Sequence, residues 1–210
     1  MDDSKKEGYV KYTAEHTPAA AMAAEDPGWK ELDEGRTHLY DLGLIGALPG
    51  GIGFGNTSVR MTGGVFLISG TSTGGKRVLG ADGYCAVSAF DIEKNRVASF
   101  GPVRASAESM SHGAVYLACP SVRSVIHIHS RKIFDAMLRD GYPRTPADAL
   151  YGTPEMARAI AACVKEQGAS RGLIVMTGHD EGVIAYGGSV KEAMDLIREL
   201  YHTYNYKQEA

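Results

Sequence analysis

The sequence lacks the features that mark nucleic-acid-binding and membrane-spanning proteins. Its 210 residues carry a formal net charge of −3, and lysine and arginine form nothing longer than pairs such as Lys5-Lys6 and Lys76-Arg77. A nucleic-acid partner is therefore not expected. The longest apolar runs are far too short to cross a bilayer, so no membrane partner is expected either.

Cysteine is also scarce. The three cysteines, Cys85, Cys119 and Cys163, are scattered and form no CxxC pair, so no disulfide framework is expected. The N-terminal segment MDDSKKEGYVKYTAEH is too polar for a secretory signal. Together these absences predict a cytoplasmic protein that functions under reducing conditions.

Glycine, in contrast, is abundant, and its 26 residues predict many tight turns. Residues 1–25 have little apolar periodicity, so we expect a poorly specified arm there, either mobile or folded as a short lead-in helix. Residues 26–210 are expected to form a single domain, since this length suits one hydrophobic core. Asp26 as N-cap and Pro27 at the first helical position predict where its first helix begins.

The order of elements predicts the fold class. After the first helix come four short strand candidates, at 57–61, 64–69, 84–90 and 96–101. Strands and helices then alternate: a helix capped by Ser106, strand 121–129, a helix capped by Ser130, helix 153–168, strand 172–178 and helix 189–204. This order predicts an α/β fold, a three-layer α/β/α sandwich with a central mixed, mostly antiparallel sheet, rather than a Rossmann fold.

Two histidines in the segment SVIHIHSRK, His127 and His129, raise the question of a metal site. Side chains alternate between the faces of a strand, so both imidazoles project on one side, about 6–7 Å apart by strand rise. Two imidazoles placed in this way can chelate one metal ion, with zinc as the first choice and manganese, cobalt or iron as alternatives. The competing interpretation is two packed or partly exposed histidines in an edge strand.

Further candidate ligands lie elsewhere in the chain. His179 ends the buried strand 172–178, and strand ends are where α/β proteins build their sites; alone, it would be interpreted as a loop histidine. Glu108 is expected in the first turn of the helix before the histidine strand, where an acid also stabilises the helix dipole. His112 lies four residues on, on the same helix face, and is expected to support the site or to pack.

Two glycine-rich stretches offer hydrogen-bond donors to an anion. GIGFGNTSVR places Asn56 and Ser58 next to Gly53 and Gly55, and ISGTSTGGK places four hydroxyl side chains beside Gly70, Gly74 and Gly75. Backbone amides and hydroxyl groups in such loops can hold an anion, and Lys76 and Arg77 are close in sequence. Each loop taken alone is also compatible with an ordinary tight turn.

Taken in order, the segments GNTSVR, STGG, SAESMSH, VIHIHS and GHDEGVIAYG resemble the class II aldolase/adducin family over residues 30–204. The resemblance implies that His127, His129 and His179 are metal ligands and that Glu108 is an acid/base that can also touch the metal. It implies substrate-phosphate contacts at Asn56, Thr73, Gly74 and Ser106. Gly55, Lys76, Arg77 and His112 are retained as possible supporting residues.

The resemblance also implies an activity and an assembly. We expect a zinc-dependent lyase of the aldolase type that cleaves a small, phosphorylated or otherwise anionic, sugar-derived substrate through a metal-stabilised enediolate. Epimerase, dehydratase or decarboxylase chemistry on the same site is the alternative, and a non-catalytic assembly domain like the adducin head is a third. A homotetramer with active sites between subunits is implied.

The sequence departs from the family pattern at two places. The sugar-phosphate aldolases have two adjacent serines before the glutamate, whereas this chain has Ser106 followed by Ala107, which removes one hydroxyl donor, worth ~1 kcal/mol of binding. The resemblance also implies a tyrosine that acts on the substrate, from a neighbouring subunit or from the C-terminal tail, and the segment between the histidine strand and residue 151, which bears the usual neighbour tyrosine, is short. Candidates for a tail tyrosine are Tyr201, Tyr204 and Tyr206.

Overall fold

The computed structural model describes residues 11–22 and 27–206, without the side chain of residue 206. The strands are β1 (Thr13–Pro18), β2 (Gly46–Ala47), β3 (Gly53–Phe54), β4 (Asn56–Arg60), β5 (Phe66–Ser69), β6 (Tyr84–Asp91), β7 (Arg96–Gly101), β8 (Ser124–His129), β9 (Gly172–Val175) and β10 (Gly182–Gly187). The α-helices are α1 (Trp29–Asp41), α2 (Ser109–Ala118), α3 (Arg131–Arg139), α4 (Pro154–Gln167) and α5 (Val190–Tyr206). Two 3-10 turns lie at Thr62–Gly64 and Ala81–Gly83.

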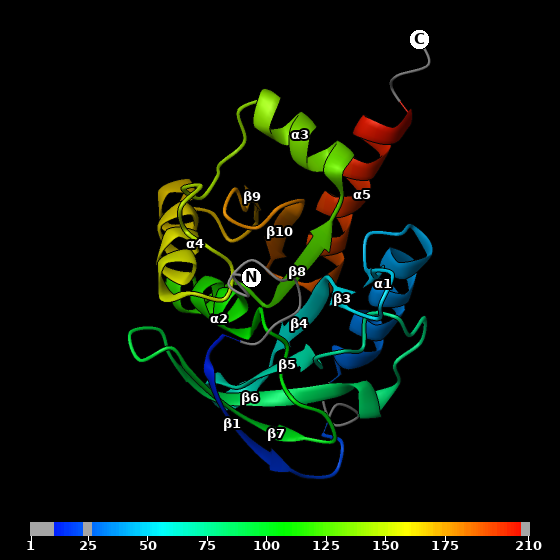
Figure 1. Cartoon of the computed structure of the whole chain (residues 1–210), viewed down its shortest axis with the longest axis vertical. Helices are drawn as coiled ribbons and strands as arrows, with labels where there is room; N and C mark the ends of the chain where they lie inside the picture. Colours follow the sequence, from blue (N-terminus) through cyan, green and yellow to red (C-terminus); the bar gives the residue numbers. More distant parts are fainter. Residues whose placement is uncertain (1–10, 23–26, 207–210) are drawn as a thin grey trace.

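Eight strands form the main sheet in the order β1-β7-β6-β5-β4-β8-β10-β9 (Figure 1). Six of the neighbouring pairs are antiparallel, and only β1 and β7 run parallel. The short strands β2 and β3 form a separate two-stranded sheet. The expected mixed, mostly antiparallel sheet is therefore confirmed.

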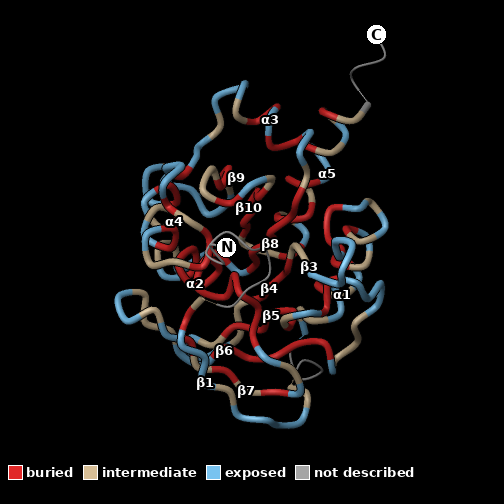
Figure 2. The backbone as a smooth tube through the Cα atoms, in the orientation of Figure 1, coloured by how far each residue is buried: buried red, intermediate tan, exposed pale blue. Residues whose placement is uncertain are grey.

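Helices cover both faces of this sheet. On one face α1, α3 and α5 pack over a core that contains Leu39, Ile133 and Ile197, and on the other α2 and α4 pack over a core that contains Met110 and Ile160. The buried segments coincide with the central strands and the inner sides of the helices (Figure 2). The three-layer α/β/α sandwich predicted from the order of elements is thus the architecture of the chain.

Strand β8 is central, paired with β4 on one side and β10 on the other. Its side chains alternate as expected: Ile126 and Ile128 enter the core under α1, α3 and α5, whereas Val125 enters the core under α2 and α4. His127 and His129 therefore lie on the α2/α4 side of the sheet, like Val125. The central strand holds both rings in a fixed register with the neighbouring strands.

The N-terminal expectations need correction. An unspecified arm over residues 1–25 does not hold for residues 13–18, which form edge strand β1 beside β7. Their side chains are mostly exposed, so apolar periodicity could not reveal the strand. Asp26 lies outside the described residues, and Pro27 precedes the helix, which begins at Trp29 after Gly28 without a side-chain cap.

The turn before α2 also differs from the expectation. The helix begins at Ser109, and Glu108 is the N-cap residue rather than part of the first turn. Ser106 precedes it, and its Oγ accepts a hydrogen bond of 3.4 Å from the Glu108 amide. The Ser106 carbonyl accepts bonds from the Ser109 amide and hydroxyl. Glu108 is therefore held by a tight turn that precedes α2, and not by the regular part of the helix.

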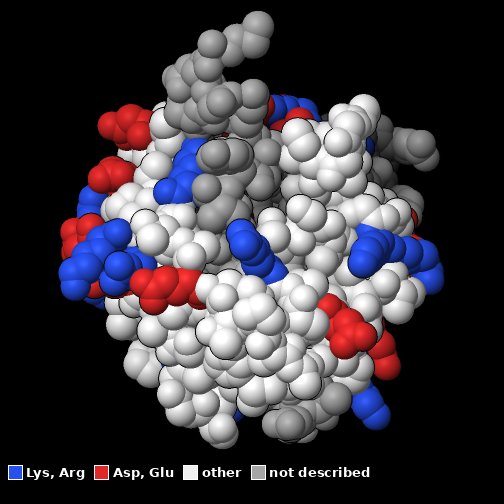
Figure 3. Space-filling view, turned by 60° about the horizontal axis from the view of Figure 1, so that its bottom comes forward, with Lys and Arg blue, Asp and Glu red and all other residues white. Residues whose placement is uncertain are grey.

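The surface agrees with the mixed charge of the sequence. On the face shown in Figure 3, acidic and basic side chains are interspersed, mostly around the margin, and neither sign forms a large patch. Within the described part of the chain, no helix has the length and apolarity needed to span a bilayer.

Candidate active site

Three histidine rings meet at the C-terminal end of the central strand β8. His127 and His129 come from β8 and His179 from the turn between β9 and β10, and all three are buried. Nε2 of His129 lies 3.0 Å from Nε2 of His127 and 2.9 Å from Nε2 of His179. Ligands of a tetrahedral zinc ion lie about 3.3 Å apart, which follows from metal–nitrogen bonds near ~2.05 Å. The cluster therefore has the spacing and the nitrogen donors of a metal site, slightly contracted.

The partners of the rings indicate which nitrogens are available as ligands. Nδ1 of His127 donates to the Val183 carbonyl at 3.2 Å, so its Nε2 carries the lone pair. Nδ1 of His179 lies 3.5 Å from Oε1 of Glu108, so its Nε2 is likewise directed at the cluster. Burial lowers the pKa of His129 well below its usual value, and the neutral ring is the form that binds metal. These residues fit a divalent metal ion.

Glu108 is the carboxylate of the site. It is buried, its Oε2 accepts a 2.6 Å hydrogen bond from the Ser111 hydroxyl, and its Oε1 faces His179. Burial alone would raise its pKa, but the contacts with His179 and Ser111 and the nearby His127 outweigh burial and lower the pKa below its usual range. Glu108 is therefore held as a carboxylate within reach of the histidine cluster.

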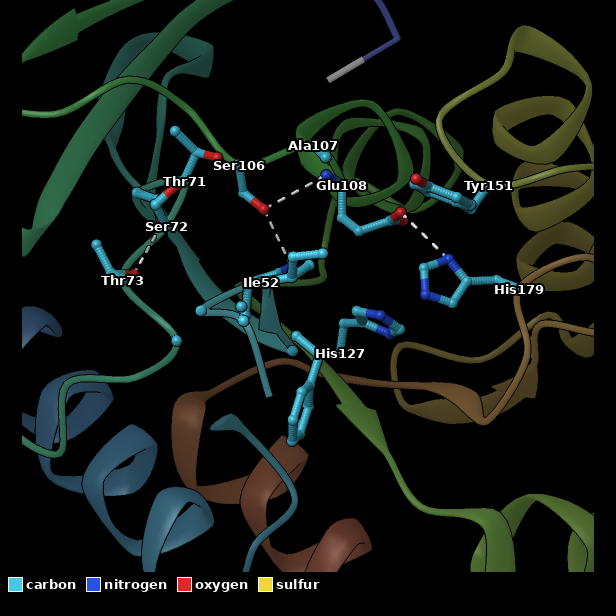
Figure 4. Close-up of a pocket in the computed structure, with 18 residues that line it drawn as sticks. Ile52, Thr71, Ser72, Thr73, Ser106, Ala107, Glu108, His127, Tyr151 and His179 are labelled. Carbon is cyan, nitrogen blue, oxygen red and sulfur yellow. Dashed lines mark hydrogen bonds and ion pairs between the residues drawn. The ribbon is translucent and has the colours of Figure 1, made fainter. Parts of the chain in front are cut away.

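Glu108, His127 and His179 form one wall of a cavity of about 280 Å³, which His129 does not line. Figure 4 shows Glu108 pointing at His179 on one side and Ser106 and Thr73 on the other. The polar residues that line the cavity are Asn56, Thr71, Ser72, Thr73, Ser106, Glu108, His127, Tyr151 and His179. The cavity is thus wide enough for a small polar substrate between the two walls.

The four residues expected to contact phosphate, Asn56, Thr73, Gly74 and Ser106, also line the cavity, and Figure 4 shows Thr73 and Ser106 on the side away from His179. Nδ2 of Asn56 donates to Oγ of Ser106 at 3.1 Å, and its Oδ1 is buried without a partner among the described residues. The Thr73 hydroxyl donates to the Gly70 carbonyl at 2.7 Å, which closes the loop. Gly55 also lines the cavity, with a φ of +72° and no room for a Cβ, which would lie 2.7 Å from Ile45.

Three of the possible supporting residues lie outside the cavity. Lys76 and Arg77 are exposed and do not line it, and Arg77 pairs instead with Asp41 at 2.6 Å on the surface. His112 is fully buried in the helix layer, with Nδ1 2.7 Å from the Ser58 hydroxyl. Burial lowers the pKa of His112 to about 3, so it is a neutral packed histidine.

The tail tyrosines are also separate from this cavity. The Tyr204 hydroxyl donates to Asp140 at 2.8 Å, and the Tyr206 side chain lies outside the described residues. Tyr201 lines a neighbouring cavity of about 460 Å³, which reaches His129 from the other side. Within one chain, no described tail tyrosine lines the cavity beside Glu108.

Two residues at the site were not among the candidates from the sequence. Tyr151 lines the cavity, and its ring centroid lies 4.6 Å from that of His179, edge to face. A Cβ at Gly182 would lie 2.9 Å from the His179 ring and 3.1 Å from the His127 ring. Gly182 follows His179 by three residues and precedes an apolar strand. An isolated glycine in such a position indicates a close approach to the backbone, and this was the available clue in the sequence.

A comparison with protein families identifies the family of the chain. Residues 50–205 match the family described as Class II Aldolase and Adducin N-terminal domain, which is most of the chain. The chain belongs to this family. A search of curated protein sequences gave no match.

Solved structures share the fold. An L-fuculose-1-phosphate aldolase from Thermus thermophilus is 24% identical, with a TM-score of 0.61 over 84% of this chain and 90% of that one. YgbL from Klebsiella pneumoniae, described by the alternatives aldolase, epimerase or decarboxylase, is 20% identical, with a TM-score of 0.61 over 85% and 86%. A sugar-phosphate aldolase from Thermotoga maritima is 16% identical, with a TM-score of 0.63 over 84% and 91%. At these identities the likeness shows the shared fold.

Proposed function

We propose that this member of the family is a metal-dependent lyase of the aldolase type, acting on a small, anionic, sugar-derived substrate. The observation that carries the proposal is the placement of Glu108: its Oε1 faces His179 of a cluster of three buried histidines, beside a cavity that polar loop residues also line. A structural histidine cluster would need neither the carboxylate nor the open cavity beside it.

His127, His129 and His179 would hold the metal, for which zinc is the first choice and manganese, cobalt and iron are alternatives. When bound, a divalent metal supplies Lewis-acid polarisation of a substrate carbonyl and stabilises negative charge that develops on it. The Nδ1–H of His127 on the Val183 carbonyl fixes the tautomer of that ligand. The protein thus orients its ligands through a second set of hydrogen bonds.

Glu108 would move the proton. Oε2 is held by the Ser111 hydroxyl, which leaves Oε1 on the side of His179 as the acting oxygen. As a carboxylate it can take a proton from the carbon adjacent to the substrate carbonyl or return one to it after carbon–carbon cleavage. Tyr151 lies beside Glu108 and His179 and excludes water from this side of the cavity.

The loop wall would hold the anionic group of the substrate. Asn56, Ser106, Thr73 and Gly74 offer side-chain and backbone donors there. Ala107 also lines the cavity, in the place where the family pattern has a second serine. One donor fewer favours an anion that needs fewer hydrogen bonds, so the substrate class is expected to differ from that of the sugar-phosphate aldolases.

A second reaction class remains a candidate because one specific observation favours it. Proton transfer by Glu108 next to a polarised carbonyl serves epimerases, dehydratases and decarboxylases as well, and YgbL, which shares the fold, carries the alternatives epimerase and decarboxylase. Products separate the classes: a lyase releases an aldehyde, a decarboxylase releases CO₂, and an epimerase leaves the mass of its substrate unchanged.

The deciding experiment begins with elemental analysis of the purified protein. We expect about one transition metal ion per chain, retained by Glu108→Gln and lost by a histidine variant. A screen of phosphorylated and carboxylated sugars against the metal-loaded protein then identifies the product. A protein that neither holds nor takes up metal would support the interpretation as a non-catalytic assembly domain. Light scattering tests the expected tetramer.

A further inference from the structure

One buried cation lies close to the site but outside its cavity. Arg36, in the middle of α1, is only 1% exposed, and its guanidinium donates to four backbone carbonyls of one loop. Nη2 donates to the carbonyls of Thr73 at 3.1 Å and Gly74 at 3.2 Å. Nη1 donates to the Arg77 carbonyl at 2.8 Å and to the Lys76 carbonyl. Arg36 therefore binds nearly every residue of the segment 73–77.

This arrangement differs from an ordinary buried ion pair. No described carboxylate lies within ion-pair distance of Arg36, and its recorded hydrogen bonds all end on carbonyl oxygens. An arginine stays protonated at physiological pH, so a full positive charge is fixed behind the loop. A buried charge without an ion-paired carboxylate is costly, and the four carbonyl oxygens, with Asp33 nearby, offset part of that cost.

The loop presents its other side to the cavity. Thr73 and Gly74 line the wall opposite Glu108. Because a trans peptide points its N–H opposite to its C=O, carbonyls 73 and 74 directed at Arg36 turn the amides of Gly74 and Gly75 away from it. A second residue of α1 reinforces this: the Tyr40 hydroxyl donates to the Gly75 carbonyl at 3.4 Å.

We propose that Arg36 is the positioning residue of an oxyanion-binding loop, residues 73–77. It orients the peptide groups of the loop so that amide hydrogens face away from the guanidinium, toward the substrate side, and it adds a fixed positive charge behind them. The group recognised is an oxyanion, a phosphate or a carboxylate. The inference rests on the proposed function, because it takes the polar wall of the cavity as the place where the anionic end of the substrate binds.

The chain contains a matched control in Arg60. Its guanidinium also donates to backbone carbonyls, those of Val122 at 2.8 Å, Tyr116 at 2.6 Å and Cys119 at 3.2 Å, but neither Arg60 nor these partners line the cavity. Replacing either arginine by methionine removes a carbonyl-binding cation. Of the two, only Arg36 holds a segment that lines the cavity.

The test measures binding of inorganic phosphate and of acetate to the metal-loaded protein by calorimetry, with metal content determined in parallel. We expect Arg36→Met to weaken binding of the preferred anion about tenfold, which corresponds to ~1.4 kcal/mol, with the metal content of wild type. Arg60→Met should keep wild-type anion affinity. Amide hydrogen exchange should accelerate over residues 73–77 in Arg36→Met alone.

The outcomes separate this inference from the proposed function. Wild-type anion affinity and exchange in Arg36→Met would overturn the role of Arg36 alone. If wild type binds metal but neither anion, the oxyanion role fails together with the anionic part of the proposed function, and the metal site stands. If Arg36→Met does not fold, Arg36→Lys takes its place, because lysine keeps the charge but lacks the planar guanidinium that binds several carbonyls at once. Anion affinity of Arg36→Lys equal to that of wild type and of Arg60→Met would then contradict the proposal. A loss of anion affinity in Arg36→Lys alone would support it.

Discussion

The two walls of the cavity are built by different means. The histidine wall consists of side chains, with His127 and His129 fixed by β8 and His179 by the turn after β9. The loop wall includes backbone of Thr73 and Gly74, which belong to the segment 73–77 whose peptide groups Arg36 orients from behind. On the first wall the identity of the lining residue determines the chemistry. On the second wall, the orientation of the backbone donors is determined by Arg36, a residue that does not line the cavity.

This difference predicts how each wall fails. A change to a side chain on the histidine wall removes a chemical group and leaves the scaffold, because β8 is paired on both sides. A change at the loop wall moves several donors together, because they share one support. Substitutions that affect one wall should therefore leave the function of the other intact.

The largest expected effect is loss of turnover in Glu108→Gln. The amide keeps the shape and the Ser111 contact but cannot take a proton, so kcat should fall by about 10²–10⁴-fold. Metal content and phosphate affinity should stay at wild-type values. Turnover is followed as release of product from the substrate found by the screen. An active Glu108→Gln protein would remove this residue from the mechanism.

Metal affinity should separate two buried histidines, His129 and His112. His129→Ala removes one of the three proposed ligands, so we expect it to weaken metal binding more than ~100-fold. Changing a residue that only supports a ligand typically weakens metal binding by about 10–100-fold. His112→Ala removes a buried ring that faces Ser58 and should keep the metal, at a cost of about 1–3 kcal/mol in unfolding free energy. Titration with a competing chelator measures the metal affinity of both variants. Equal metal loss in the two variants would refute the assignment of ligands.

Two glycines allow each wall to be disturbed separately. A Cβ at Gly182 would press on the His179 and His127 rings, so Gly182→Ala should lower metal affinity about tenfold and leave anion affinity in the metal-saturated protein unchanged. A Cβ at Gly74 would lie 2.1 Å from the Gly46 carbonyl oxygen, so Gly74→Ala should displace the loop and weaken phosphate binding with metal retained.

Gly75→Ala is the control for both substitutions. Its Cβ would meet Ala47 at 3.4 Å, an ordinary contact, so both affinities should stay at wild-type values. If Gly182→Ala weakened phosphate binding as strongly as Gly74→Ala does, the two walls would be coupled and the comparison would fail.

The histidine wall was largely predictable from the sequence, and the loop wall only in part. Alternation along a strand places His127 and His129 on one face whatever the surrounding fold, so a local rule was sufficient. His179 required an argument about strand ends, and family resemblance joined it to the pair. A helix cap is equally local: Ser130 accepts the expected bond from the Ile133 amide, whereas Ser106 does not cap α2, whose N-cap residue is Glu108.

The parts that could not be predicted depend on contacts between distant segments. Arg36 and Gly74 are 38 residues apart, and nothing near Arg36 indicates that its guanidinium is buried. Lys76 and Arg77 were expected near the anion because they are adjacent in sequence, but they point to the surface, where Arg77 meets Asp41. Sequence distance was therefore a poor guide to which cation serves the loop. The single domain over residues 26–210 stays a prediction.

The last prediction concerns the pH dependence of stability that a buried, neutral His112 gives. Burial lowers its pKa to about 3, below the ordinary 6.5, so between these values the unfolded chain binds a proton that the folded chain does not. Its contribution to stability is complete above about pH 6.5 and declines as the pH falls toward 3. We expect His112→Gln, which cannot titrate, to show a shallower acid-side loss of unfolding free energy than wild type. Urea denaturation of both proteins, stripped of metal, from about pH 4 to pH 7 measures this; parallel pH profiles would mean that His112 is not the neutral buried histidine that its surroundings imply.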